Sequence, residues 1–296
     1  MINKKIAIAV LARDCNEALQ RNIPRVEQLR SYFGESGVVV VENDSKDGTK
    51  ETLQKWAQSS NNVAVISNDY GTATISASTN KDPYPEFGLG RIEKMARYRN
   101  IYMDYIRENF SEVHYVIMLD IDVLYFDAQG VVDSINGAPQ DWQALFAFGR
   151  MYRRFRSEKV MTLAGYYDMF AYTNNDTKFP ITRKSILSGR KELTKQIKQV
   201  NYCCCTSAFG GLGVYKWQSI NTLSYRAELN DDTQVRVLCE HIPFNRHLSG
   251  LYIARDMVLV YNISSRLETI KKWLVPKFLR KKLRIVIGYL KGASKK

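Results

Sequence analysis

Two aspartates interrupt an otherwise apolar stretch near the middle of this 296-residue chain. The segment 115–126 reads YVIMLDIDVLYF, and its only charged residues are Asp120 and Asp122. An unpaired charge inside a strand is costly, so we expect the strand to end where the aspartates begin. Alternation puts both side chains on one side, where they could hold Mg²⁺ or Mn²⁺ against a departing diphosphate. Two exposed or helix-capping aspartates are the alternative.

A second polar group follows another apolar run. Residues 38–53 read VVVVENDSKDGTKETL, which predicts a strand, a short Asp/Ser/Gly loop and a helix. A carboxylate at the end of such a strand, such as Glu42, can accept hydrogen bonds from a nucleotide base or ribose. The competing interpretation is a plain strand–turn–helix connection, with Ser45 or Asp47 capping the helix.

The elements that must position these residues alternate through the first half of the chain. Apolar runs predict strands over 6–12, 37–43, 63–67, 115–123 and 144–149. Helix-like patterns lie between them, and this alternation predicts an α/β fold with a mostly parallel sheet flanked by helices. Ligands of such sheets bind at the carboxyl ends of the strands, which is where the polar groups stand.

The stretch from about 150 to 200 is less regular. It is rich in Arg, Tyr, Asn and Thr and shows no clear period. We expect a loop region there that faces the substrate.

Taken in order, VVVENDSKDGT, RIEKMARYRN and YVIMLDIDV resemble motifs of the GT-A fold glycosyltransferases that use nucleotide sugars. They are most similar to those of the capsule-associated mannosyltransferase group first described in cryptococcal fungi, and more broadly to family-two-like enzymes. The resemblance covers residues 5–125 well and 200–250 more loosely. It implies a Rossmann-like GT-A sheet, a UDP- or GDP-sugar donor, and Mn²⁺ or Mg²⁺ as cofactor.

The resemblance also implies roles for residues at the strand ends. Ala12 and Arg13 would line the base pocket. Glu42 would contact the base or ribose, with Asp44 nearby. Asp120 would face the ribose or sugar.

A helix over about 91–108 would contact the sugar or diphosphate of the donor. The resemblance places four residues there, Arg91, Arg97, Arg99 and Asn100. Separations of six and two residues point in different directions on a helix, so at most two of the three arginines can meet one ligand. Solvated arginines on an amphipathic helix are the alternative.

The second half resembles the acceptor side of these enzymes, with a Gly-rich turn in YCCCTSAFGGLGVYKW before an acidic segment. Glu240 would act as the general base, with Asp232 as a competing acid. His241 would join Asp122 as a metal ligand, because imidazole also suits Mn²⁺. Alternatively, Glu240 and His241 form a surface pair. A base at Glu240 implies inversion at the anomeric carbon, whereas the cryptococcal family implies retention.

Charge is unevenly distributed along the chain. Of the net charge of +13, residues 266–296 carry +10, with eleven Lys or Arg and a single acid, Glu268. Their mixture of basic and apolar residues predicts a segment that lies on an anionic membrane surface, the alternative being a solvated helix. We therefore expect a catalytic domain over 1–265, with a nucleotide-binding part over 1–125 and an acceptor part over 126–265, followed by this tail.

The five cysteines do not form a disulfide framework, and a zinc site at Cys203–Cys205, Cys239 and His241 lacks metal-ligand spacing. The N-terminal apolar run is too short for a signal peptide or a membrane span. We expect a cytoplasmic enzyme, peripheral at the inner face of the membrane.

Such an enzyme would transfer sugar to a glycan or lipid-linked acceptor for capsule or lipopolysaccharide. A nucleotidyltransferase is one alternative, but AVLARDCNEAL lacks a Gly-rich phosphate loop. A non-catalytic sugar-binding protein is another. The near-neutral body argues against nucleic-acid binding.

Overall fold

The computed structural model describes residues 2–73, 84–154 and 161–265. It divides into two compact units, one of residues 1–150 and 165–261 and one of residues 151–164 and 262–296. The described residues of the second unit belong to strands. The basic tail lies outside the described residues, so the structure does not address its predicted role.

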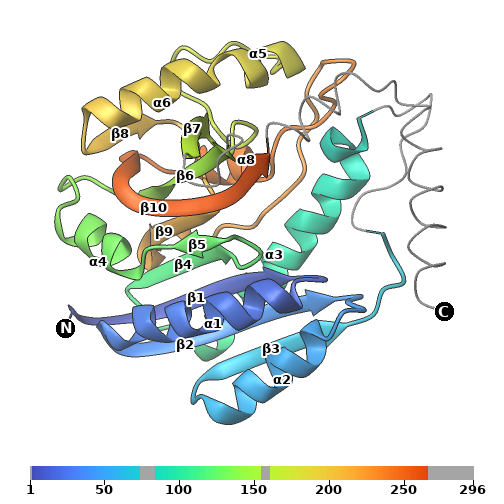
Figure 1. Cartoon of the computed structure of the whole chain (residues 1–296), viewed down its shortest axis with the longest axis vertical. Helices are drawn as coiled ribbons and strands as arrows, with labels where there is room; N and C mark the ends of the chain where they lie inside the picture. The colour runs from blue at the N-terminus through green and yellow to red at the C-terminus, as the bar shows by residue number, and fades with distance from the viewer. Residues whose placement is uncertain (1, 74–83, 155–160, 266–296) are drawn as a thin grey trace. The chain divides into compact units, whose positions relative to one another are not determined.

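Four strands of the first unit form a parallel sheet in the order β3-β2-β1-β4 (Figure 1). They are β1 (Ile2–Ala12), β2 (Phe33–Asn43), β3 (Val63–Asn68) and β4 (Tyr115–Asp120). The helices of this part are α1 (Asn16–Ser31), α2 (Thr49–Ser59), η1 (Pro85–Phe87), α3 (Leu89–Asn109) and α4 (Ala128–Asn136).

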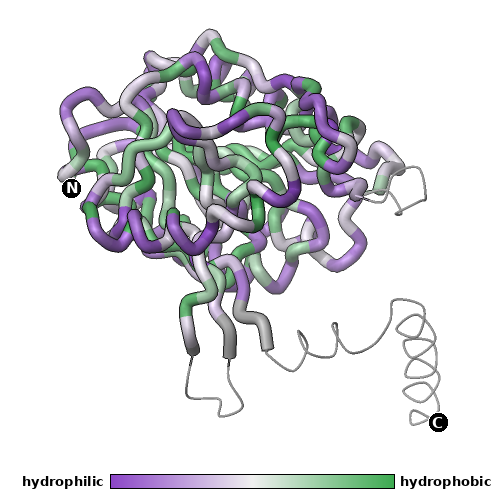
Figure 2. Tube along the Cα trace, turned by 90° about the horizontal axis from the view of Figure 1, so that it is seen from above, coloured by the Kyte–Doolittle hydropathy of each residue, from purple (hydrophilic) through white to green (hydrophobic). Residues whose placement is uncertain are grey.

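The alternation of strand side chains explains how helices cover both faces. Ile6, Ile8 and Val10 of β1 belong to a buried apolar cluster with residues of α1, α2 and α4. The side chains between them point to the opposite face, where α3 contacts β1 and β2. Figure 2 shows hydrophobic residues gathered along the inner strands and hydrophilic residues on the outer segments.

The second half of the sheet is antiparallel where its pairing is described. β9 pairs antiparallel with β4 and β6, and β10 pairs antiparallel with β5 and β8. These strands are β5 (Tyr125–Phe126), β6 (Ala144–Arg154), β7 (Met161–Tyr166), β8 (Tyr202–Cys205), β9 (Leu212–Lys216) and β10 (Leu251–Ser265). The predicted α/β class is confirmed, although among the pairings whose register is described, the parallel ones are confined to four strands.

Most predicted elements of the first half are present with small shifts at their ends. The strand expected over 115–123 stops at Asp120, as the cost of burying its carboxylates requires. The loop region expected over 150–200 is wrong in part, because it contains two helices. The remaining helices are α5 (Arg183–Ser188), α6 (Arg190–Gln199), α7 (Trp217–Ile220) and α8 (His241–Asn245). Among the described residues, no helix combines the length and apolarity needed to cross a membrane.

Candidate active site

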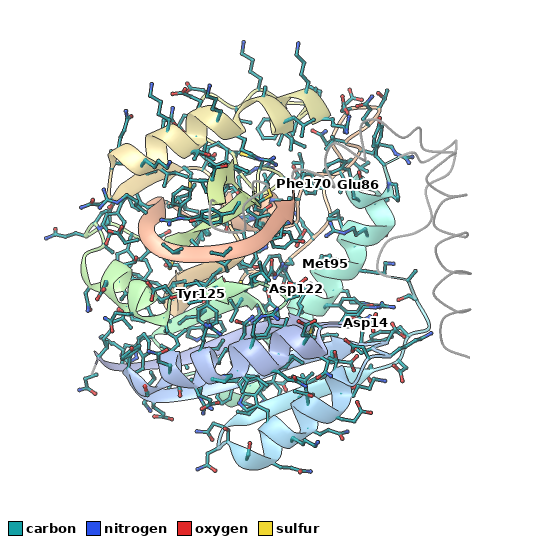
Figure 3. The ribbon with its side chains drawn as sticks, in the orientation of Figure 1. Asp14, Glu86, Met95, Asp122, Tyr125 and Phe170 are labelled. Atoms are coloured by element: carbon teal, nitrogen blue, oxygen red, sulfur yellow. The ribbon has the colours of Figure 1, made fainter. Side chains whose placement is uncertain are left out.

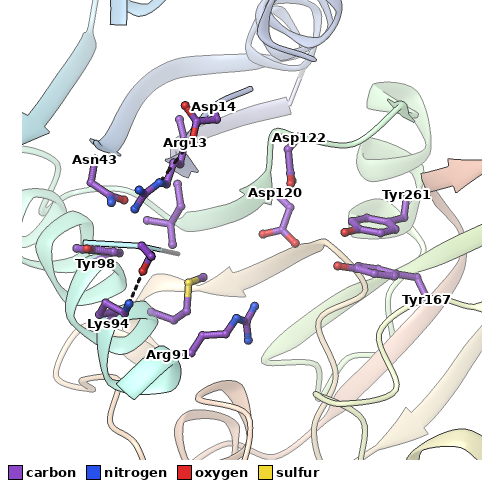
Figure 4. Close-up of a pocket in the computed structure, with 14 residues that line it drawn as sticks. Arg13, Asp14, Asn43, Arg91, Lys94, Tyr98, Asp120, Asp122, Tyr167 and Tyr261 are labelled. Carbon is purple, nitrogen blue, oxygen red and sulfur yellow. Dashed lines mark hydrogen bonds and ion pairs between the residues drawn. The ribbon is translucent and has the colours of Figure 1, made fainter. Parts of the chain in front are cut away.

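The parallel register brings three strand ends to one edge of the sheet. Ala12 pairs with Glu42 and Leu11 with Asp120, so the loops after β1, β2 and β4 leave the sheet together. A cavity of about 270 Å³ opens there (Figure 4). It is lined by Leu11, Ala12, Arg13, Asp14, Asn43, Ala73, Arg91, Lys94, Met95, Tyr98, Asp120, Asp122, Tyr167 and Tyr261.

Hydrogen bonds lock the loops after β1 and β2 to each other. The Asp14 N–H donates to Ser45 Oγ at 3.0 Å, and the Lys46 N–H donates to Asp14 Oδ1 at 2.8 Å. The Asn16 N–H donates to Asp47 Oδ2 at 3.0 Å. Part of the DSKDGT motif is thus used within the protein, where it fixes the shape of the cavity wall.

Glu42 does not line the cavity. Its side chain is fully buried, Oε1 accepts from the Ser45 N–H at 2.8 Å, and Oε2 accepts from the Ser67 hydroxyl. The next residue, Asn43, faces the cavity instead. The structure therefore offers Asn43, which the sequence analysis did not select, for a contact to a base or ribose.

Asp44 holds the rim of the cavity. Its carboxylate accepts from Asn43 Nδ2 at 2.9 Å and from the Gly71 N–H at 2.6 Å. The Asn43 bond above all, against the effect of burial, lowers the pKa of Asp44 to about 2, with further help from Gly71 and the charge of Arg13. Arg13 Nη1 lies 3.5 Å from Asp44 Oδ2, so this carboxylate orients the cavity-lining guanidinium.

Asp120 is the last residue of β4 and Asp122 follows two residues later, and both line the cavity (Figure 4). Figure 3 labels Asp122 among the side chains of the described residues. Asp120 is 23% exposed, and Asp122 is exposed. Among the described residues, Arg99 is the only cation within 4.0 Å of Asp120, and none is that close to Asp122. Partial loss of hydration at the cavity raises the pKa of Asp120 to about 8 against the opposing charge of Arg99, and it also raises the pKa of Asp122.

The three arginines of α3 enter three environments, as their spacing predicts. Arg91 lines the cavity, and within the described part of the chain it has no carboxylate partner. Arg97 stacks over the Tyr70 ring at 4.4 Å. Arg99 is buried beneath the cavity. Lys94, which the sequence analysis did not select, also lines the cavity.

Asn100 has a structural position away from the cavity. Its Nδ2 donates to the Tyr225 carbonyl at 2.9 Å, and its Oδ1 accepts from the Tyr225 N–H at 2.7 Å. Both polar atoms of the amide are thus used to tie α3 to a later segment. Its expected contact with a donor has no geometric support.

Glu240 and His241 are buried, so the alternative of a surface pair is wrong. Arg99 Nε donates to Glu240 Oε1 at 2.9 Å. Burial alone would raise the pKa of Glu240, but the charge of Arg99 prevails and lowers it to about 2. A carboxylate held ionised in this way is a weak base, whatever its distance from a substrate.

His241 packs its ring against Phe209, with the centroids 4.1 Å apart. Neither ring nitrogen has a hydrogen-bond partner among the described residues. Burial, followed by the charge of Arg99, lowers the pKa of His241 to about 3. His241 is not among the cavity-lining residues with Asp122, so the structure does not assemble the predicted pair of metal ligands.

Asp232 lies in a loop outside the cavity. Its Oδ1 accepts from the backbone N–H groups of Gln234 at 2.9 Å and Val235 at 2.7 Å. The side chain closes a local turn, an ordinary role for aspartate. The structure gives no support to Asp232 as the base.

Besides Asn43 and Lys94, the sequence analysis missed two aromatic residues of the cavity. Tyr167 and Tyr261 stack with centroids 3.7 Å apart and line the cavity opposite Arg13 and Tyr98 (Figure 4). The next residue, Asp168, was not selected either and is not among the residues that line the cavity; burial raises its pKa to about 6, against a hydrogen bond from the Ala171 N–H. The segment GYYDMFAY carries the same signal as β4, an acid within an aromatic run.

The donor set suits a hard divalent cation shared with a ligand. No group of three or more His, Cys, Asp or Glu in the described part of the chain forms a complete metal site. Asp120 and Asp122 nevertheless present carboxylate oxygens to the cavity without sufficient counter-charge. Two carboxylates fit Mg²⁺ or Mn²⁺, which complete their shells with water and phosphate oxygens. All five cysteines are free, and zinc ligation by them has no support.

Comparison with known families settles the class of protein. The model of the cryptococcal mannosyltransferase 1 family matches residues 5–241. The chain belongs to this family. The predicted family, a family of glycosyltransferases, is therefore confirmed. A search of the curated proteins finds no match to this chain.

Several solved glycosyltransferase structures are distantly similar. The mannosyltransferase PcManGT from Pyrobaculum calidifontis, in complex with GDP-Man and Mn²⁺, is 13% identical with a TM-score of 0.45, over 88% of this chain and 57% of its own. S. aureus TarS 1–349 in complex with UDP-GlcNAc is 12% identical with a TM-score of 0.43, over 87% of this chain and 58% of its own. Mycobacterium tuberculosis glucosyl-3-phosphoglycerate synthase, in complex with Mn²⁺, UDP and phosphoglyceric acid, is 11% identical with a TM-score of 0.41, over 88% of this chain and 69% of its own. This chain thus spans less than two thirds of the first two, and such distant similarities carry no functional conclusion.

Proposed function

We propose that the chain transfers a sugar from a nucleotide diphosphate donor to a hydroxyl of a glycan or lipid-linked acceptor, and that it needs Mn²⁺ or Mg²⁺. One observation carries the proposal. Within the described part of the chain, a single cavity collects two carboxylates with too little counter-charge and two cations without a carboxylate partner: Asp122 has no cation within 4.0 Å, Asp120 has only Arg99 at 4.0 Å, and the cations are Arg91 and Lys94. A metal diphosphate complements both sets at once, because it presents a cation and phosphate oxygens side by side.

The donor would lie across the cavity from the β1 end to the tyrosine pair. Arg13, Asn43 and Tyr98 offer a guanidinium, an amide and an aromatic ring to a nucleoside. Arg91 and Lys94 offer N–H donors to the phosphates. A divalent cation held by Asp122 and Asp120 would supply Lewis-acid stabilisation of the leaving diphosphate.

We propose that Asp168, in place of Glu240 and Asp232, is the general base that takes the proton from the acceptor hydroxyl. A general base works best when its pKa lies near the operating pH. The pKa of Asp168 is raised to about 6, whereas that of Glu240 is lowered to about 2. Asp168 also follows a cavity-lining residue and is close enough to Asp120 to influence its pKa.

Release of free nucleotide tests the donor proposal. A panel of UDP- and GDP-sugars is incubated with the protein and Mn²⁺, with and without EDTA. We expect release from at least one donor, lost with EDTA and reduced about 10²–10³-fold in Asp122→Asn. A protein that only binds sugars would shift in thermal unfolding with a donor but release nothing, and that result would overturn the proposal.

The role of Asp168 is tested once a donor and an acceptor are known. We expect Asp168→Asn to lower kcat for transfer about 10²–10⁴-fold while the KM for the donor stays within a few-fold, since a base acts on the acceptor. Glu240→Asp, which keeps the charge beside Arg99, is the control. NMR of the anomeric proton of the product then decides between inversion and retention.

The tail 266–296 extends the proposal to location. Its charge of +10 and interspersed apolar residues support peripheral binding to an anionic, cytoplasmic membrane face, where precursors of capsule or lipopolysaccharide are built. Liposome flotation compares the full chain with a 1–265 truncation on anionic vesicles. Equal binding by both proteins would overturn the role of the tail.

A further inference from the structure

A second, larger cavity of about 510 Å³ lies in the first unit and shares no lining residue with the first. Its walls come from the segment 173–179, the end of β8 and the segment 246–252 that leads from α8 into β10. Its size falls in the range of ligand sites. Nothing in the proposed chemistry at Asp120 and Asp122 uses it.

Both charged side chains that line this cavity already have partners, and its one cation is ion-paired, which favours a neutral ligand over an anionic one. Asp141 accepts from the Tyr252 hydroxyl at 2.9 Å. Arg246 Nη1 lies 2.8 Å from Glu228 Oε1. A phosphate or nucleotide would find no free cation there, in contrast to Arg91 and Lys94 in the first cavity.

The remaining lining combines aromatic faces with amides and hydroxyls. Phe179 is 54% exposed, an unusual state for this residue, and Arg246 lies 6.0 Å from its ring centroid. The side chains of Asn174, Asn175 and Thr206 present amide and hydroxyl groups beside it. A neutral ligand with many hydroxyls and exposed C–H faces matches such a surface, because rings pack on C–H groups and amides pair with hydroxyls.

We propose that this cavity binds a neutral oligosaccharide, the part of the acceptor that is remote from the reacting hydroxyl. The identification as acceptor rests on the proposed function. Tyr167 lines the first cavity and Thr173 the second, so six residue-to-residue steps separate them. Because each step of an extended chain covers at most about 3.5 Å, Tyr167 and Thr173 are no more than about 21 Å apart. A chain of a few sugars bridges that distance.

Cys204 provides a direct readout of occupancy, because it is exposed and lines this cavity. The other cysteines are buried, and Cys203 and Cys239, which do not line this cavity, serve as internal references. Alkylation of Cys204 by iodoacetamide is followed by mass spectrometry, with mannohexaose, maltohexaose or cellohexaose as probes at about 10 mM. For a millimolar Kd, we expect at least one hexasaccharide to slow alkylation about tenfold, and the free hexose to have little effect.

Variants separate this site from the first cavity. Phe179→Ala should abolish the protection and Phe179→Trp should keep it, whereas Asp122→Asn should protect as the wild type does. Absence of protection by all three hexasaccharides, or protection that survives Phe179→Ala, would overturn the proposal. Nucleotide release is measured in parallel: protection without release by the wild type would overturn the proposed function and leave the glycan site standing.

Discussion

Glu240, at the start of α8, and Asp120, at the end of β4, both lie within 4.0 Å of Arg99 but are in opposite electrostatic states. Glu240 is buried against Arg99 at 2.9 Å, and its pKa falls to about 2. Asp120 has Arg99 only at 4.0 Å, and its pKa rises to about 8. One guanidinium cannot compensate both groups.

The difference separates structure from function. A buried carboxylate with its own guanidinium is satisfied within the fold, so it holds α3 against the α8 region. Carboxylates that lack a partner must find their counter-charge elsewhere, and they face a cavity. Unsatisfied charge that opens onto a cavity is a better indication of a ligand site than an acid at a motif position.

Replacing the carboxylate by an amide should destabilise the fold at Glu240 but not at Asp122. Glu240→Gln leaves Arg99 buried with too little counter-charge, and we expect a loss of about 3–5 kcal/mol in the free energy of unfolding. Asp122→Asn should cause no loss without metal, because its raised pKa means that folding disfavours the ionised form. Urea unfolding of both variants in EDTA at pH 7 measures this. Equal losses would remove the distinction between the two regions.

Arg91 and Arg97 provide a second contrast on one helix. Arg91→Ala should raise the KM for the donor about 10–100-fold, because charge-assisted hydrogen bonds to phosphate are worth about 1.5–3 kcal/mol. Arg97 does not line the cavity, although its guanidinium stacks on Tyr70 and on the cavity-lining Tyr98. Arg97→Ala should therefore change this KM less than threefold. Steady-state kinetics at saturating acceptor gives both values. A larger effect at Arg97 would relocate the phosphates.

His241 tests the buried region through pH. Its pKa of about 3 in the folded protein lies below the unfolded value of about 6.5, so its contribution to stability is present above pH 6.5 and is lost as the pH falls toward 3. At pH 5 the stability lost through His241, relative to high pH, is about 2 kcal/mol.

His241→Phe keeps the stack on Phe209 and removes the titrating group. Between pH 7 and pH 5, the wild type should therefore lose about 2 kcal/mol more stability than the variant, as read by urea unfolding. Asp168 titrates in both proteins and cancels in the difference. Identical pH dependence would show that His241 has a proton or partner in the folded state.

Local sequence patterns predicted the parallel part of the fold and the end of β4. Apolar runs define these strands, and the cost of burying Asp120 dictates where β4 stops. The helices α5 and α6 were missed because their apolar residues are few and the surroundings are irregular. Of the strands in the second half, β6 was predicted over 144–149, but most of the others were missed because short strands paired across long separations leave little local signal.

The candidate site was predicted only where a residue's neighbours in the chain determine its surroundings. Asp122, Arg13 and Arg91 reach the cavity because each stands at a strand end or on the exposed part of a helix turn. Glu42, Asn100 and Glu240 carry the expected chemical groups, but distant partners use them within the fold. Which partner wins depends on tertiary packing, which spacing along the chain does not reveal.

The central claim is that Asp120 and Asp122 obtain their counter-charge from a metal and a diphosphate. Isothermal titration calorimetry of UDP and GDP, with Mn²⁺ or with EDTA, tests it most directly in the wild type and in Asp122→Asn. We predict that one nucleotide binds the wild type at least about 100-fold more tightly with Mn²⁺, a coupling of about 2.7 kcal/mol, and that the variant loses this dependence. Equal affinity with and without metal, or unchanged coupling in Asp122→Asn, would contradict the account.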